Sequence, residues 1–154
     1  MSDLLDRLRD RGWRLTPQRR AVAEVLAGEH LHLSAEAVHL RAQQLLPEVS
    51  LATVYNTLNE LVSMGEVLEV AAGDGPKRYD PNAHTPHHHL VCTGCGMLRD
   101  IFHAPVPPLE LCADDAHGYV LSRVEVVYEG LCPDCARSAA GEPDEKDAPL
   151  ATSA

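Results

Sequence analysis

The spacing of apolar residues follows a helical repeat over the first 65 positions and a strand-like alternation after them. Leu4, Leu5 and Leu8 form a short apolar stripe, which predicts a first helix that ends near Gly12. Three longer helices are expected next, because each has an N-cap residue, apolar residues at helical spacing and a stop signal. The first of these helices starts at Thr16-Pro17 and stops at Gly28. The second starts at Ser34 and ends before Pro47, and the third starts at Ser50 and ends at Gly65.

The segment after the last of these helices has the pattern of a β-hairpin. EVLEV (66–70) and KRYD (77–80) are strand-like runs that flank Gly73-Asp74-Gly75, a turn sequence. Three helices followed by a hairpin are typical of a winged helix-turn-helix, in which the helix from Ser50 to Met64 would be the recognition helix. An apolar stripe alone indicates only core packing, but this helix also has polar side chains that can reach phosphates and base edges. These are Ser50, Thr53, Tyr55 and Asn56.

The second half of the chain begins with PNAHTP (81–86), which lacks periodicity and is expected to be a hinge. HHHLVC (87–92) and MLRDIF (97–102) are expected to be strands around a Cys-Thr-Gly-Cys turn. YVLSRVEVVY (119–128) alternates and predicts a half-buried strand, with Glu125 on its polar face.

The remaining segments complete the predicted domain organisation. Residues 104–117 are rich in proline and predict a loop with at most a short helix. The tail from residue 138 has no core pattern and is expected to be disordered. The predicted parts are a DNA-binding domain, a hinge, a metal-binding domain and a tail, at 1–80, 81–86, 87–137 and 138–154.

Composition and charge narrow the class of protein. The 154 residues are 45% hydrophobic, enough for one large or two small domains. No apolar run approaches the ~18 residues needed to cross a bilayer, and the charged N-terminus lacks a signal-peptide segment, so we expect a cytoplasmic protein without a membrane partner. The net charge of −10 argues against nucleic acid, but residues 1–20 hold six arginines against three aspartates. A DNA contact therefore belongs to the N-terminal half.

Two Cys-x-x-C pairs, Cys92/Cys95 and Cys132/Cys135, can close a tetrahedral thiolate site. In a reducing cytoplasm, paired cysteines indicate metal ligands before disulfides. The alternatives are two unrelated pairs or a redox dithiol, although a redox Cys-x-x-C opens a helix and Cys92 follows a strand-like run. The spacing predicts one structural zinc ion that joins the start and the end of the second domain.

Three consecutive histidines precede the first cysteine pair. In a strand, His87 and His89 share one face and His88 points away. Asp80 and Asp100 could add carboxylates, and imidazole with carboxylate suits exchangeable, redox-active metals. Isolated histidines are normally solvated surface residues, but this group beside a zinc site indicates a second metal site.

Four segments together resemble the ferric uptake regulator (Fur) superfamily. They are RLTPQRRAV (14–22), SLATVYNTLNELVSMGEV (50–67), HHHLVCTGCG (87–96) and CPDC (132–135). The resemblance implies an α+β fold, with an N-terminal winged helix-turn-helix joined by a hinge to a C-terminal α/β dimerisation domain. It also implies a homodimer that represses transcription from palindromic promoter DNA when a regulatory metal is bound.

Within this superfamily the chain is similar to the peroxide-sensing branch (PerR- or CatR-like). That branch holds its regulatory metal with three histidines and two aspartates, and the matching positions are His32, Asp80, His87, His89 and Asp100. Uptake regulators more often have Glu where this chain has Asp100. The resemblance therefore implies structural Zn²⁺ at the four cysteines and Fe²⁺ or Mn²⁺ at the second site, one of each per subunit.

The implied function is a repressor of oxidative-defence genes that senses hydrogen peroxide. Peroxide reacting at bound Fe²⁺ would oxidise a ligand histidine, either His32 or His87, and the opened site would release DNA. The Mn²⁺ form should repress but sense poorly.

The resemblance also implies which residues contact DNA. Tyr55 would touch base methyl groups and Asn56 a base edge or a phosphate. Arg14 and Arg19 would contact the backbone or a minor groove, which gives affinity and salt dependence rather than specificity. An Asn after Tyr55 is a further likeness to the peroxide-sensing branch.

An iron- or zinc-responsive uptake repressor of the same superfamily is the main alternative. A zinc hydrolase or deaminase needs an open zinc position, and a deaminase also needs a His-x-Glu motif that HHHLVC lacks. A bare zinc-ribbon module would leave the capped helices and the hairpin of residues 1–80 unexplained. The sequence therefore predicts a regulator and not an enzyme.

Overall fold

The computed structural model describes residues 4–27, 32–71, 73–102, 111–122 and 124–141. The chain divides into two units, Met1–His87 and His88–Ala154. The division lies just after the expected hinge, and it assigns His87 to the first unit. Both helices and sheets are present, as the α+β class requires. No helix among the described residues is long and apolar enough to span a membrane.

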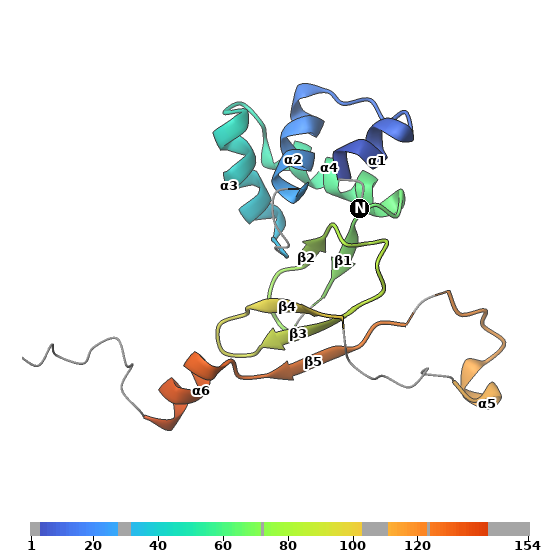
Figure 1. Ribbon diagram of the computed structural model, residues 1–154, viewed down its shortest axis with the longest axis vertical. Coiled ribbons are helices and arrows are strands. Elements are labelled where there is room, and N and C mark those ends of the chain that lie inside the picture. Colours follow the sequence, from blue (N-terminus) through green and yellow to red (C-terminus); the bar gives the residue numbers. More distant parts are fainter. Residues whose placement is uncertain (1–3, 28–31, 72, 103–110, 123, 142–154) are drawn as a thin grey trace, which may run out of the picture. The chain divides into compact units, whose positions relative to one another are not determined.

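Four helices form most of the first unit (Figure 1). They are α1 (Leu4–Asp10), α2 (Pro17–Ala27), α3 (Ala35–Leu45) and α4 (Leu51–Ser63), which confirms the helices expected from the apolar spacing. The expected N-caps are also present: Thr16, Ser34 and Ser50 each accept a hydrogen bond from the backbone N–H three residues later. The chain turns with positive φ at Gly12 and Gly65, beyond the ends of α1 and α4. The expected stop at Gly28 lies outside the described residues.

The core of the first unit is built from the apolar faces of these four helices. Because residues three and four apart share a helix face, each helix contributes one stripe. The buried apolar residues are Leu4, Leu8, Ala21, Val22, Ala23, Leu26, Ala35, Val38, Ala42, Val49, Val54, Leu58, Leu61, Val67 and Tyr79. This core fixes the orientation of α4 and of the hairpin that follows it.

A two-stranded antiparallel sheet follows α4, as expected for residues 66–80. Strand β1 (Leu68–Val70) pairs with β2 (Arg78–Asp80), with Leu68 opposite Asp80. Leu33 adds an isolated bridge to this sheet, because the Tyr79 N–H donates to its carbonyl oxygen at 2.9 Å. The bridge brings the segment before α3 beside the end of β2, where two candidate metal ligands lie.

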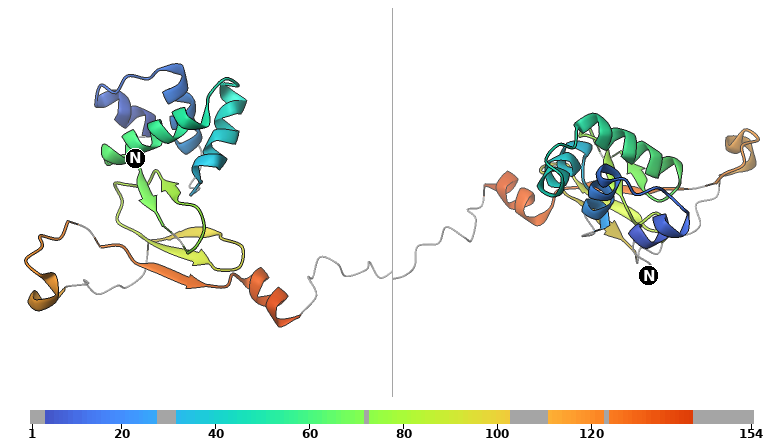
Figure 2. Two further views of the ribbon diagram at one scale, coloured as in Figure 1. Left: turned by 180° about the vertical axis from the view of Figure 1, so that it is seen from behind. Right: turned by 90° about the horizontal axis from the view of Figure 1, so that it is seen from above.

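The second unit contains a three-stranded sheet in the order β4-β3-β5. Its strands are β3 (His88–Cys92), β4 (Leu98–Ile101) and β5 (Val127–Gly130), with β4 antiparallel and β5 parallel to β3. The unit also has a short helix, α5 (Ala113–Ala116), and α6 (Pro133–Ala140), which follows β5 in both views of Figure 2. The short helix agrees with the interpretation of residues 104–117, although residues 104–110 lie outside the described part.

The strand expected over residues 119–128 is wrong in extent. Among residues 119–122 and 124–130, which the structure describes, a strand forms only over Val127–Gly130, and Val120 is 96% exposed. A strand needs a hydrogen-bonding neighbour, and β5 pairs with β3 only from His89 to Cys92. Alternation of apolar residues was therefore not sufficient to place this strand.

The start of the expected disordered tail is also wrong. Residues 138–140 belong to α6, which begins with Pro133 in its first turn and ends at Gly141 in the left-handed conformation. A capped helix start and a glycine end can define a helix that has no apolar stripe. The remaining tail residues, 142–154, lie outside the described part of the chain.

Candidate metal centres

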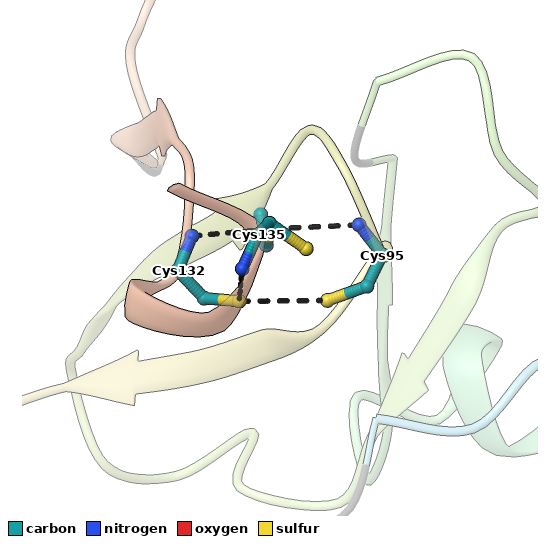
Figure 3. A group of neighbouring side chains, drawn as sticks. Cys95, Cys132 and Cys135 are labelled. Atoms are coloured by element: carbon teal, nitrogen blue, oxygen red, sulfur yellow. Dashed lines mark hydrogen bonds between the residues drawn. The ribbon is translucent and has the colours of Figure 1, made fainter. Parts of the chain in front are cut away.

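The four paired cysteines converge on one point in the second unit. Cys92 ends β3 and Cys95 lies in the turn after it, whereas Cys132 caps α6 and Cys135 lies in its first turn. The four sulfur atoms all lie within 4.8 Å of one another. Figure 3 shows the sulfur atoms of Cys95 and Cys132 facing each other, 3.9 Å apart. The predicted clustering of the two pairs is confirmed.

The cluster is electrostatically suited to a cation. Backbone N–H groups of Cys132 and Cys95 donate to the Cys92 sulfur at 3.2 and 3.5 Å and lower the pKa of that thiol to about 6. Hydrogen bonds with the side chains of Cys132 and Cys92 raise the pKa of the Cys135 thiol to about 12. Four thiolates this close together repel one another, so full ionisation requires a bound metal ion. Among the described residues this group consists of four sulfur atoms alone, which is the ligand set of a closed, structural zinc site.

The first unit gathers three of the predicted regulatory ligands. His32 precedes the Leu33 bridge, Asp80 ends β2, and His87 ends the unit. The Asp80 carboxylate oxygen Oδ2 lies 2.7 Å from His87 Nε2 and 3.7 Å from His32 Nε2. All three side chains are at most 2% exposed. They form a buried polar cluster within a largely apolar unit.

The hydrogen bonds of His87 test whether this cluster fits a metal. His87 Nδ1 lies 2.7 Å from the Thr85 carbonyl oxygen, which can only accept, so Nδ1 must carry a hydrogen. In the neutral ring the lone pair of Nε2 then faces the Asp80 carboxylate at 2.7 Å. Two acceptors at that distance require a second proton or a cation between them. A divalent metal ion between them would bind both the Nε2 lone pair and the Asp80 carboxylate, so these residues fit a metal site.

The second unit brings together the other two predicted ligands. His89 on β3 stands opposite Asp100 on β4, and His89 Nε2 lies 3.7 Å from Asp100 Oδ1. Two donor atoms that each lie ~2.1 Å from one ion are roughly 3–4 Å apart, so this pair has the spacing of adjacent ligands. Sequence reasoning missed Glu125, whose Oε1 lies 2.9 Å from His89 Nδ1. The alternating pattern had assigned Glu125 to a solvent face.

The residues predicted to contact DNA lie mainly at the start of α4. Ser50 caps this helix and its hydroxyl lies 2.9 Å from that of Thr53. Tyr55 and Asn56 are exposed on the next turn. The Tyr55 hydroxyl donates to Glu36 at 2.7 Å, and this hydrogen bond raises the pKa of Tyr55. The start of α4 is thus a polar, solvent-facing helix end.

The two predicted arginine contacts have different surroundings. Arg14 is exposed. The Arg19 guanidinium pairs with the Glu60 carboxylate at 2.6 Å and lies 4.8 Å from the centre of the Trp13 ring. Trp13 also donates to Glu60 at 2.9 Å. Arg19 must therefore leave or share Glu60 in order to contact a phosphate.

Comparison with known proteins shows which family the chain is similar to. Residues 10–128 match the sequence profile of the Ferric uptake regulator family. The chain is 31% identical over 135 residues to the peroxide-responsive repressor PerR of Staphylococcus saprophyticus, covering 88% of this chain and 90% of that protein. It is 35% identical over 136 residues to the transcriptional regulator FurA of Mycobacterium tuberculosis, covering 88% of this chain and 92% of that protein.

A solved structure gives the same result at the level of the fold. The Campylobacter jejuni peroxide stress regulator is 28% identical, with a TM-score of 0.60, and the match covers 87% of this chain and 100% of that chain. Sequence and structure thus agree over most of the length. The chain belongs to the Ferric uptake regulator family.

Proposed function

We propose that this member of the family is a peroxide-sensing, metal-dependent repressor of oxidative-defence genes. Members of the family are metal-responsive transcriptional regulators and not enzymes, and they bind DNA as dimers. The further step, to peroxide, rests on the composition of the second metal site. Its predicted ligands are three imidazoles and two carboxylates, and none is a thiolate. Such a set suits Fe²⁺ or Mn²⁺, whereas four thiolates suit structural Zn²⁺.

In this proposal one regulatory ion is shared between the two units. His32, Asp80 and His87 would be its ligands from the first unit, and His89 and Asp100 its ligands from the second. The 2.7 Å approach of His87 Nε2 to Asp80 Oδ2 supports this, because both are donor atoms that one divalent ion could hold side by side. In the proposal the two sets together would supply five protein ligands, more than the two or three of either unit alone. The hinge at 81–86 would then be fixed only when the ion is bound.

The sensing step is an oxidation of one ligand ring, at His32 or His87. A bound Fe²⁺ ion would supply the electrons that activate peroxide. In net terms one peroxide oxygen is inserted at a ring carbon, and the other leaves as water. The oxidised ring loses its basic nitrogen lone pair, so that histidine no longer binds metal. Both rings are buried against Asp80, which keeps them close to where the ion would lie.

DNA binding would use the helices and the hairpin of the first unit as a winged helix-turn-helix. The polar start of α4, with Ser50, Thr53, Tyr55 and Asn56, would enter the major groove. Arg14 and Arg19 would contact the DNA backbone or a minor groove. A homodimer would place two such helices on the half-sites of a palindrome. The exposed apolar residues before β5, including Tyr119 and Val120, support a covered surface in the second unit.

Intact-mass spectrometry paired with DNA binding tests this proposal. Protein loaded with Fe²⁺ receives a stoichiometric pulse of hydrogen peroxide, and the same sample is assayed on an inverted-repeat operator. We expect loss of binding together with a gain of one oxygen atom on a peptide that contains His32 or His87. The Mn²⁺-loaded protein should show neither change. Iron-loaded protein that stays on DNA with no gain in mass would refute peroxide sensing.

The second candidate is an iron- or zinc-responsive uptake repressor. The observation that favours it is the 35% identity to the transcriptional regulator FurA of Mycobacterium tuberculosis. It predicts that operator affinity follows the free concentration of one metal and is unchanged by peroxide. The same operator titration, repeated with Fe²⁺, Mn²⁺ and Zn²⁺, separates the two candidates.

A further inference from the structure

The two ring nitrogens of His89 have different carboxylate neighbours in the second unit. Nε2 faces Asp100, 3.7 Å away, at the spacing of two ligands on one ion. Nδ1 lies 2.9 Å from Glu125 Oε1, at hydrogen-bond distance. A carboxylate can only accept, so Nδ1 is the donor. The neutral ring therefore keeps its lone pair on Nε2, on the side of Asp100.

The position of Glu125 is fixed by the sheet. The His89 N–H donates to the Val126 carbonyl oxygen at 3.1 Å, and His89 stands opposite Val127 in the parallel ladder of β3 and β5. Glu125 is the residue immediately before this anchored pair. His89 is fully buried and the Glu125 side chain is 26% exposed, so the contact is shielded on the histidine side. The contact thus depends on strand pairing and not on a chance surface geometry.

His87, which lies just before β3, has a neutral partner at the same ring position. His87 Nδ1 donates to the backbone carbonyl of Thr85. An anionic acceptor withdraws the Nδ1 hydrogen more strongly than a carbonyl does, and it makes Nε2 a better electron-pair donor. A carboxylate behind a ligand histidine also adds negative charge close to the cation without occupying a coordination position. His89 is therefore a proposed ligand whose donor strength a carboxylate side chain, that of Glu125, can set.

We propose that Glu125 is a positioning residue for the regulatory metal, which holds His89 in the tautomer that presents Nε2 to the ion. The inference rests on the proposed function, because His89 must be a ligand for its tautomer to matter. Glu125 itself would remain outside the coordination sphere. Removal of such a partner lowers metal affinity by roughly 10- to 100-fold.

Three variants test this role: Glu125→Ala removes the acceptor, Glu125→Gln keeps a neutral acceptor, and Glu129→Gln is a matched control. Glu129 lies on β5 and is exposed, so its loss removes the same charge from the same strand. Full-length protein with its zinc in place and no regulatory metal is labelled with ¹⁵N at histidine. Long-range ¹H–¹⁵N spectra at about pH 8, above the usual histidine pKa, assign the His89 tautomer. Mn²⁺ affinity is measured in parallel by competition with a chelator.

We expect the Nδ1–H tautomer of His89 in the wild type, in Glu125→Gln and in Glu129→Gln, and a mixture in Glu125→Ala. Mn²⁺ affinity should fall by roughly 10- to 100-fold in Glu125→Ala, less in Glu125→Gln and less than twofold in Glu129→Gln. An unchanged tautomer and affinity in Glu125→Ala would overturn the proposal. So would a Co²⁺ absorption spectrum in which Glu125→Ala lowers the coordination number, because Glu125 would then be a ligand. If the wild type itself bound no Mn²⁺, the proposed function would fail, while the tautomer result would still report on the contact.

Discussion

At the scale of single residues, Gly94 is the tightest constraint on the cysteine cluster. A Cβ atom added at Gly94 would lie 2.9 Å from the Cys135 sulfur and 3.0 Å from its Cβ. The sulfur of a metal ligand cannot move away without changing the coordination geometry. A glycine in the turn between Cys92 and Cys95 is therefore required by the close approach of α6.

We expect Gly94→Ala to weaken zinc binding and to destabilise the second unit by about 1–3 kcal/mol, the usual cost of overpacking. Zinc content after dialysis against a chelator, together with the thermal midpoint, measures both effects. Gly130→Ala is the control, because no atom lies within 4 Å of its added Cβ. Equal zinc retention in the two variants would show that the turn can adjust.

The residue scale also shows why one part of the metal centre could be predicted and another could not. Cys-x-x-C spacing specifies two ligands per turn, so the cluster followed from sequence alone. His32 was placed only by resemblance, because nothing local distinguishes it from other histidines. Glu125 and His89 are 36 residues apart in sequence, and their contact depends on the pairing of β3 with β5. Alternating polarity describes one strand and carries no information about its neighbour.

At the scale of elements, Glu66 connects three segments of the first unit. It follows α4, and its carboxylate forms ion pairs with Arg7 and Arg11 near the C-terminal end of α1, both at 2.8 Å. His84 of the 81–86 segment lies 3.0 Å away. The Glu66 side chain is only 1% exposed. The His84 side chain is 48% exposed and thus reaches a buried carboxylate from the surface.

We expect Glu66→Gln to destabilise the first unit by about 1–3 kcal/mol, because the buried group loses its charged hydrogen bonds. Burial raises the pKa of Glu66, but hydrogen bonds from Arg7 and His84 more than offset this and lower it below its ordinary 4.5. Because the pKa of Glu66 is lower in the folded state, its ionised carboxylate stabilises the first unit fully at pH values above the ordinary pKa of 4.5. That stability is lost as the pH falls through the folded-state pKa. The deficit of the variant should therefore be large at pH 7 and shrink in acid.

Urea unfolding at several pH values, followed by the fluorescence of Trp13, measures this difference. Trp13 is the only tryptophan and it packs against the core of the first unit. Glu24→Gln is the control, because Glu24 forms an exposed pair with Arg20 at 3.7 Å. Such pairs contribute about 0–1 kcal/mol. A deficit in Glu66→Gln that does not change with pH would contradict the assignment.

At the scale of the whole molecule, the basic N-terminus is less available to DNA than its composition indicates. Five of the six arginines in residues 1–20 form ion pairs within the first unit. These are Arg7, Arg9, Arg11, Arg19 and Arg20. A local charge of +3 read from the sequence includes charges that the fold has already paired with Glu24, Glu60 and Glu66. Net charge limits the class of partner but does not identify which side chains meet phosphate.

The proposed sharing of one ion between the two units makes a prediction about the 81–86 segment. If the ion holds ligands from both units, it must leave one half before this segment can open to a protease. The rate of cleavage is proportional to the fraction of protein in the open form. Metal binding lowers that fraction, and cleavage slows by the same factor. At free Mn²⁺ about a hundred times its Kd, we expect roughly hundredfold slower cleavage by proteinase K.

Replacement of neighbouring histidines on β3 separates a shared ion from a general effect of Mn²⁺. His89→Ala removes a proposed ligand of the second unit and should abolish protection, whereas His88→Ala removes the adjacent ring, which alternates to the other face, and should keep it. Intact masses of the fragments locate the cut between Asp80 and His87. Protection that survives in His89→Ala would mean that the ion binds to the first unit alone. The hinge would then be free in the metal-bound protein, and metal could not control the spacing of the DNA-binding helices in the way proposed.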